Sequence, residues 1–141
     1  MKFTNPDSAI AEDEILRCEA DCGIRLPCPL RLIYLDSNGG EPDPYVFQND
    51  ELDTVVSEFL PLKSELRGTA VQSYIRLVRE KAIVFANFFP FAVDGGGDYF
   101  FVDTKTPDGK VYIFRSEATK SPALLPLGIG IDEFWMALKP E

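Results

Sequence analysis

One segment in the second half of the chain limits the possible folds most, because it is apolar without any alternation. Residues 83–93 are almost entirely apolar, and the turn sequence Asp-Gly-Gly-Gly-Asp follows at 94–98. Two further apolar stretches, Tyr99–Asp103 and Val111–Phe114, flank residues 106–109, where Pro, Asp and Gly stand in the order typical of a hairpin turn. A strand with one solvent-exposed face would alternate apolar and polar residues. Because this cluster does not alternate, it predicts a sheet that is covered on both faces.

Helical patterns surround the strand cluster on both sides. Helices that are segregated from hairpins are typical of the α+β class. The chain has 141 residues and neither an internal repeat nor a linker, which predicts a single domain over 1–141. In chain order we expect a helix at 6–22 capped by Asn5, a helix that opens at Pro27 and Pro29 and stops at Asn38-Gly39-Gly40, a loop at 41–44, strands at 45–47 and 54–62, a helix capped by Thr69, a polar loop at 115–122, an edge strand at 123–127 and a helix at 132–138.

The charge balance excludes several classes of function. The formal net charge is -9, with 23 acidic and 14 basic residues, so the chain is expected to repel nucleic acid and anionic lipid. This charge favours a basic protein partner, or no partner at all. Histidine is absent, which removes the commonest general base and the commonest metal ligand. The phosphate-loop and serine–lysine motifs of common enzymes are also missing, so we predict neither catalysis nor a cofactor.

The cysteines and the first residues bear on the compartment. Three cysteines, Cys18, Cys22 and Cys28, are an odd number that suits a reducing environment. They could be three thiolate ligands, but their spacing fits no common zinc pattern, so we favour small buried side chains and no metal. The first residues do not have the pattern of a signal peptide, and no apolar stretch approaches the ~20 residues of a membrane span. We expect a cytoplasmic protein.

Several polar segments have both a functional and a purely structural interpretation. Residues 94–98 form either a partner-binding loop with an acidic rim or only a turn. Residues 38–41 form either an exposed loop or the cap of a helix. Phe134 and Trp135 are either an interface anchor or the closure of the core. Acidic residues in loops and strand ends either are simply solvated or imitate the phosphate pattern of a nucleic acid; they are Asp36, Glu41, Asp43, Asp50, Glu51 and Asp53.

Three segments in this order resemble the SUKH superfamily, over nearly the whole chain. The first is the acidic helix with the following helix that ends at Asn38-Gly39-Gly40, and the second is residues 91–103. The third is residues 109–114, followed at a distance by Phe134 and Trp135. The resemblance implies an α+β fold with one curved, mainly antiparallel sheet of about five or six strands. Two N-terminal helices, a middle helix and a short C-terminal helix would flank the sheet.

The same resemblance implies a non-catalytic binding protein, because the superfamily includes bacterial immunity proteins and fungal regulators of cell-wall synthesis. We therefore expect an immunity protein that binds a basic toxin domain, such as a nuclease. The alternative is a regulatory adaptor for a cell-wall or signalling protein, and a small-ligand binder is a third possibility. No oligomeric state follows from the sequence. The candidate partner-binding residues are Asp36, Asn38, Glu41, Asp43, Asp50, Glu51, Asp94, Asp98, Tyr99 and Asp103.

Overall fold

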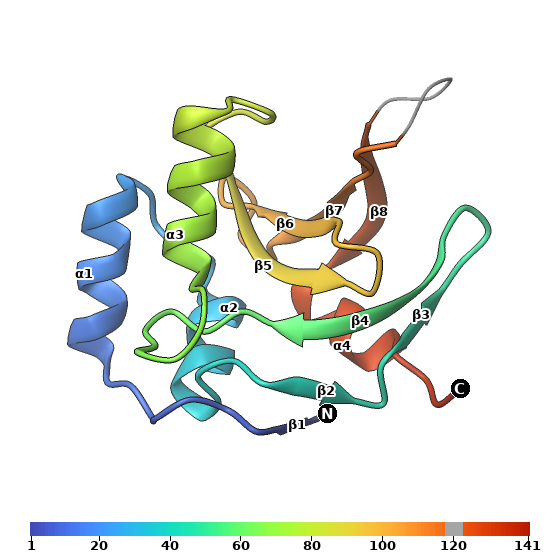
Figure 1. Ribbon diagram of the computed structural model, residues 1–141, viewed down its shortest axis with the longest axis horizontal. Helices are drawn as coiled ribbons and strands as arrows, with labels where there is room; N and C mark the ends of the chain where they lie inside the picture. Colours follow the sequence, from blue (N-terminus) through green and yellow to red (C-terminus); the bar gives the residue numbers. More distant parts are fainter. Residues whose placement is uncertain (118–122) are drawn as a thin grey trace.

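The computed structural model describes residues 1–117 and 123–141, and it confirms the α+β class (Figure 1). A six-stranded antiparallel sheet has the order β3-β4-β5-β6-β7-β8, and β1 and β2 form a small second sheet. The elements are β1 (Lys2–Thr4), α1 (Glu12–Cys22), α2 (Cys28–Asp36), β2 (Glu41–Asp43), β3 (Val46–Gln48), β4 (Asp53–Phe59), α3 (Ala70–Tyr74), the π-helix η1 (Ile75–Glu80), β5 (Phe88–Asp94), β6 (Tyr99–Asp103), β7 (Lys110–Phe114), β8 (Leu124–Gly130) and α4 (Ile131–Ala137).

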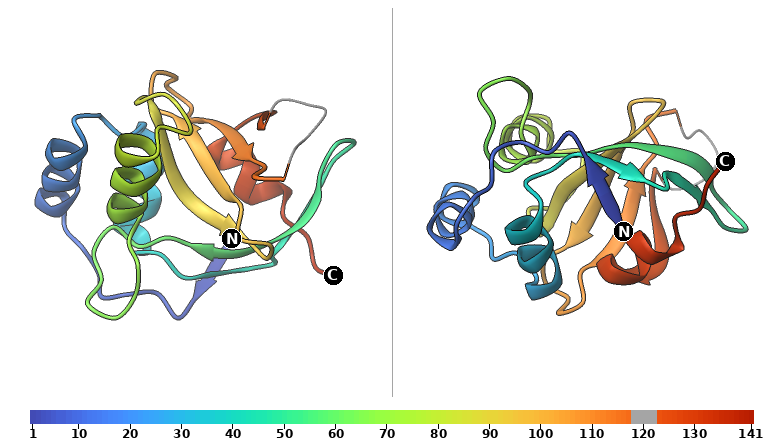
Figure 2. Two further views of the ribbon diagram at one scale, coloured as in Figure 1. Left: turned by 45° about the horizontal axis from the view of Figure 1, so that its top comes forward. Right: turned by 90° about the horizontal axis from the view of Figure 1, so that it is seen from below.

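The large sheet curls into a half-barrel around the last helix. The ring of Phe134 on α4 lies 5.3 Å from Phe47 on β3 and 5.1 Å from Phe100 on β6. Its neighbour Trp135 lies 5.3 Å from Phe59 on β4, while the other strands close to α4 are β7 and β8. A single short helix can reach strands from one edge of the sheet to the other only when the sheet wraps around it (Figure 2). Phe134 and Trp135 therefore close the core, as the structural interpretation predicts.

The central strands confirm the sheet that is covered on both faces. Phe89, Phe91, Phe100 and Phe101 are all at most 1% exposed. The register of β5 against β6 shifts next to Pro90, and such a bulge accommodates a residue that has no N–H to donate.

The apolar run does not form a strand over its whole length. The strand β5 begins only at Phe88, and residues 83–87 precede it as an irregular connection. Phe85 in this connection is 80% exposed. The prediction of a buried strand from residue 83 was therefore wrong for its first half, because apolar composition alone does not fix where pairing starts.

The first helix begins later than predicted, and the residues before it form a strand. Helix α1 starts after Ala11, and Asn5 has a positive φ of 52° instead of capping a helix. Residues 2–4 pair with residues 41–43, which the sequence analysis placed in a loop. The backbone N–H of Asp7 then donates to the Asn38 carbonyl at 3.0 Å. Both errors have one cause, since the pairing joins segments that are nearly forty residues apart.

Two other helices begin and end as the turn chemistry predicts. Pro27 precedes the first turn of α2, and Pro29 lies within that turn. The helix ends at Asp36, just before the Asn-Gly-Gly segment. Thr69 caps α3 through its side chain, which accepts a hydrogen bond from the Gln72 N–H at 3.1 Å. The last strand and last helix also form, although β8 extends to Gly130, and part of the polar loop predicted at 115–122 lies outside the described residues.

Asn38 is buried and holds three segments of chain together. Its side chain is enclosed, with the residue only 2% exposed. The amide donates to the carbonyls of Ser8 and Lys63, each at 2.9 Å, and its oxygen accepts from the Leu62 N–H at 2.9 Å. The adjacent Gly39 has a φ of +80°, and a Cβ there would lie 2.8 Å from the backbone N of Pro61. This segment is therefore an internal support and not an exposed loop.

The three cysteines differ in their surroundings. Cys22 is buried, Cys18 is half-buried and Cys28 is exposed, so the prediction of buried side chains is wrong for Cys28. Burial raises the pKa of Cys22 from the usual 9.0 to about 12. The neutral thiol therefore stabilises the folded state fully below pH 9.0, and this contribution is lost as the pH rises toward 12. Burial, followed by the nearby carboxylates of Asp21 and Glu14, also raises the pKa of Cys18.

We expect Asn38→Ala to lower the free energy of unfolding by about 2–4 kcal/mol, because it leaves a buried N–H and two carbonyls without partners. Urea denaturation measures this change. The matched control is Asp36→Ala, two residues earlier, whose side chain is exposed and whose effect should stay within about 0.5 kcal/mol. Equal effects of the two substitutions would contradict the supporting role of Asn38.

Alkylation with iodoacetamide at pH 8 should modify Cys28 first, Cys18 more slowly and Cys22 last, because the thiolate is the reactive form and burial suppresses it. Mass spectrometry of timed samples measures the order, and the urea-unfolded chain, in which the three rates should converge, is the control. If Cys22 reacted as fast as Cys28 in the folded chain, the burial of Cys22 described above would be incorrect.

Candidate partner-binding surface

The β3–β4 hairpin lies against the turn that joins β5 to β6. The N–H of Gly95 donates to the Val55 carbonyl at 2.9 Å, and the hydroxyl of Thr54 donates to the Asp94 carboxylate at 3.0 Å. Thus the start of β4 is fixed to the 94–98 turn by contacts from both backbone and side chain. The outer end of the hairpin extends beyond the body of the sheet (Figure 1).

Asp94 is a component of the turn itself. Its carboxylate accepts hydrogen bonds from the backbone N–H groups of Gly96 at 3.0 Å and Asp98 at 2.8 Å. Gly97 supplies a positive φ of 91°, which a side chain would disfavour. Asp94 is 9% exposed, so most of its surface is not available to a partner. Its geometry matches the turn interpretation of this segment.

A hollow of about 340 Å³ lies between the hairpin, the 94–98 turn and the end of β7. Acidic side chains line it from three different elements: Asp53 at the start of β4, Asp94 and Asp98 at the turn, and Glu117 after β7. Arg115 also lines the hollow. The carboxylate of Asp98 is oriented by Ser116, whose hydroxyl donates to it at 2.8 Å.

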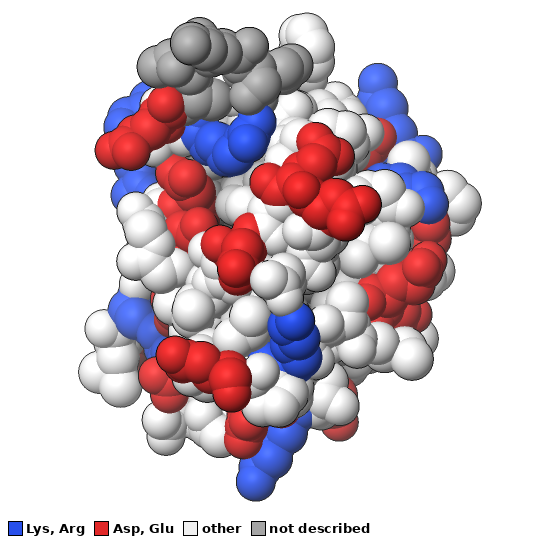
Figure 3. All heavy atoms as spheres, turned by 90° about the vertical axis from the view of Figure 1, so that its right-hand side faces the viewer, with Lys and Arg blue, Asp and Glu red and all other residues white. Residues whose placement is uncertain are grey.

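The acidic character continues to the end of the hairpin. Asp50 and Glu51 are exposed in the connection between β3 and β4. Asp53 also lines a second hollow, of about 560 Å³, together with Glu141 and Lys139. We call the carboxylates of Asp50, Glu51, Asp53, Asp98 and Glu117 the hairpin face. Figure 3 looks onto this side of the molecule, where several acidic groups are exposed, with basic groups interspersed among them.

The carboxylates of the hairpin face share with other exposed acids, such as Asp21, Asp36 and Glu65, the lack of an ion pair in the described part of the chain. Among residues 1–117 and 123–141, none of the five forms an ion pair. By contrast, Arg67 lies 2.7 Å from Asp7 and 3.0 Å from Glu58, which ties the loop before α3 to the rest of the fold. Charges that are already paired gain little from a new partner, whereas unpaired ones remain available for it.

The structure separates several candidates from the hairpin face. Asp36 ends α2, and Glu41 lies in the small sheet, where its carboxylate accepts from the Asn5 amide at 2.8 Å. Asp43 is exposed at the base of the hairpin, just before β3. Asp103 lies at the opposite end of β6 from the 94–98 turn, and its carboxylate accepts from the Asn87 amide at 2.8 Å. Asn38 is buried, as described above. Of the predicted set, Asp94 and Asp98 line the same hollow, and Asp50 and Glu51 lie in the outer connection of the hairpin that borders it.

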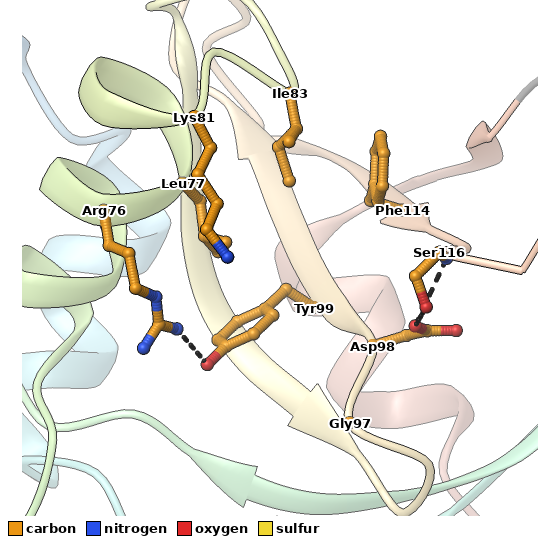
Figure 4. Close-up of a pocket in the computed structure, with 9 residues that line it drawn as sticks. All are labelled: Arg76, Leu77, Lys81, Ile83, Gly97, Asp98, Tyr99, Phe114 and Ser116. Carbon is orange, nitrogen blue, oxygen red and sulfur yellow. Dashed lines mark hydrogen bonds between the residues drawn. The ribbon is translucent and has the colours of Figure 1, made fainter.

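Tyr99 lies beside a different hollow, of about 350 Å³, between η1 and the strands β6 and β7 (Figure 4). Arg76 and Lys81 line this hollow, so it is basic where the hairpin hollow is acidic. Asp98 lines both hollows and stands at the boundary between them.

Sequence reasoning overlooked two participants in the acidic hollow. Glu117 lies in a polar loop with no motif, and Thr54 looks like an ordinary β-branched strand residue. The contact of the hairpin with the 94–98 turn brings Thr54 to Asp94, and the pairing of β6 with β7 brings Glu117 to the hollow that Asp98 lines. A usable signal would have been the hairpin itself, because residues 49–52 carry two acids between two short strands.

The site contains no metal-ligand cluster in the part of the chain that the structure describes, where no three acidic or cysteine side chains gather in such an arrangement. No helix of residues 1–117 and 123–141 has both the length and the apolar character required to cross a bilayer.

Comparison with known proteins agrees with the geometry of the fold. No curated protein gives a significant match to the chain. The sequence does match the SMI1 / KNR4 family (SUKH-1) over residues 9–128, a span that runs from just before α1 into β8. This family includes immunity proteins, and its members are generally non-catalytic immunity and regulatory proteins. The matched span includes every element that builds the hairpin face. The chain belongs to the SMI1 / KNR4 (SUKH-1) family.

Proposed function

We propose that this chain is an immunity protein that neutralises a cognate toxin by direct binding, with the hairpin face as its contact surface. The observation that supports the proposal is the group of carboxylates on the hairpin and turn that form no ion pair within residues 1–117 and 123–141, in a family that includes immunity proteins. The partner that such a surface fits is a protein with a basic cleft. A nuclease is the toxin class with that property, because its cleft must attract phosphates.

Electrostatics supports this choice of surface in two ways. The net charge of -9 produces a long-range attraction for a basic partner and raises the rate of encounter. The carboxylates of the hairpin face then supply the local pattern that orients the docked partner. Because these groups are mostly exposed, salt should weaken the association, with screening acting over ~8 Å at physiological ionic strength.

We propose that binding alone produces protection, without a catalytic step. The sequence contains no histidine, and the acidic groups of the hollow are bonded within the turn or open to solvent. An inhibitor of a toxin that acts on cellular nucleic acid would work in the cytoplasm.

Co-expression with the toxin encoded by the neighbouring reading frame tests the function. We expect cells to survive and the two proteins to purify as one complex. Continued cell death without a complex would contradict this pairing. If the chain instead captured a signalling or cell-wall protein, and no neighbouring toxin bound it, the adaptor role would be favoured.

Charge reversal tests the surface. We expect the triple variant Asp50→Lys, Glu51→Lys, Asp53→Lys to slow association with the toxin by about 10-fold or more at low salt, because it replaces attraction by repulsion where contact begins. Stopped-flow or surface-plasmon measurements give the rate.

The matched control is Asp21→Lys, Asp36→Lys, Glu65→Lys. All three of these residues are exposed, and the change in net charge is the same, but none of them belongs to the hairpin face. The control should change the rate much less. If both variants slowed association equally, only the net charge would matter, and the assignment of the hairpin face would be wrong.

A further inference from the structure

The hollow beside Tyr99 has an apolar floor. Leu77 and Ile83 line it from η1 and the following connection, and Phe114 lines it from β7 (Figure 4). Leu77 is 7% exposed, while the rings of Tyr99 and Phe114 are half-buried. With a volume of about 350 Å³, the hollow lies at the small end of the range for ligand sites and can hold one large apolar group.

Two cations border this apolar floor on the η1 side. The guanidinium of Arg76 donates to the Tyr99 hydroxyl at 2.7 Å and lies 5.8 Å from the centre of its ring. The side chain of Lys81 extends from the end of the same helix, and its amino group points toward Tyr99 (Figure 4). Neither cation forms an ion pair with a carboxylate in residues 1–117 or 123–141.

This absence of ion pairs is informative because acidic residues are abundant. The chain has 23 acidic side chains and 14 basic ones. Arg76 and Lys81 nevertheless line the same hollow without an ion pair to any carboxylate of the described residues. The acid on the opposite wall, Asp98, is held by the backbone N–H and the hydroxyl of Ser116, at 3.3 Å and 2.8 Å. The hollow therefore has a positive end at η1, a negative end at Asp98 and an apolar floor between them.

We infer that this hollow binds an apolar residue that carries a free carboxylate. The carboxylate would take charge-assisted hydrogen bonds from Arg76 and Lys81, and the apolar group would cover Leu77, Ile83 and Phe114. Such a ligand is either a small free acid or the C-terminal residue of a peptide chain. This site is separate from the hairpin face, so the inference does not depend on the proposed immunity function.

Titration monitored by amide NMR tests the inference with two matched probes. N-acetyl-phenylalanine should shift the signals of residues 76–83, 98–99 and 114–116, and its neutral amide should bind at least 10-fold more weakly. Equal shifts with both probes, or no shifts in these segments, would overturn the inference. A peptide Ala-Ala-Ala-Phe with a free C-terminus distinguishes the two sources: tighter binding than the single residue assigns the site to a chain end, and weaker binding assigns it to a small acid.

Substitutions supply the second readout. Lys81→Gln and Arg76→Gln should each reduce affinity for N-acetyl-phenylalanine by at least 10-fold. Lys81 is exposed, and among the described residues only its backbone N–H forms a hydrogen bond, to the Arg76 carbonyl, so a side-chain substitution should leave the fold intact. Arg79→Gln is the control, because it removes a cation from the same helix. The guanidinium of Arg79 lies over the ring of Tyr74 and does not line the hollow. If Lys81→Gln and Arg76→Gln bound the acid as tightly as Arg79→Gln, the two cations would have no role in binding.

Discussion

The packing of Phe134 and Trp135 inside the curled sheet is the constraint on which the rest of the structure depends. These two rings contact aromatic side chains of β3, β4, β5 and β6, including Phe91 at 5.6 and 5.7 Å. Removal of a buried aromatic ring typically costs ~3–5 kcal/mol, against a total stability of ~5–15 kcal/mol. The curled sheet thus buries α4, and β3 and β4 contribute Phe47 and Phe59 to this core while the outer end of their hairpin extends beyond the sheet (Figure 1).

Some acidic residues form ion pairs that join segments of the described chain, and others form none. Asp7 and Glu58 both pair with Arg67. Burial lowers the pKa of Arg67, but the hydrogen bonds and charges of these two carboxylates outweigh it, so the pKa is raised. Such groups stabilise the connections between segments. Among the described residues, neither the acids of the hairpin face nor Arg76 and Lys81 beside Tyr99 form such ion pairs. The outer edge of the half-barrel therefore presents an acidic and a basic hollow side by side, separated by Asp98.

Much of the fold follows from local signals, and the failures have a common origin. The turn at 94–98 and the capping by Thr69 depend on residues close in sequence, so their chemistry is visible before the structure is known. The pairing of residues 2–4 with 41–43 and the burial of Asn38 depend on segments far apart, and neither leaves a local pattern. The same limit applies to the surface. Composition predicts that it is acidic, but only the contacts between strands and turns show which acids line the same hollow.

Hydrogen exchange on the complex with the neighbouring toxin tests the central claim most directly. The account predicts that binding protects residues 48–54 and 94–98, which carry the hairpin face, and leaves α1 and the small β1–β2 sheet unchanged. Protection confined to α1 and the β1–β2 sheet, with the hairpin exchanging as in the free protein, would contradict it.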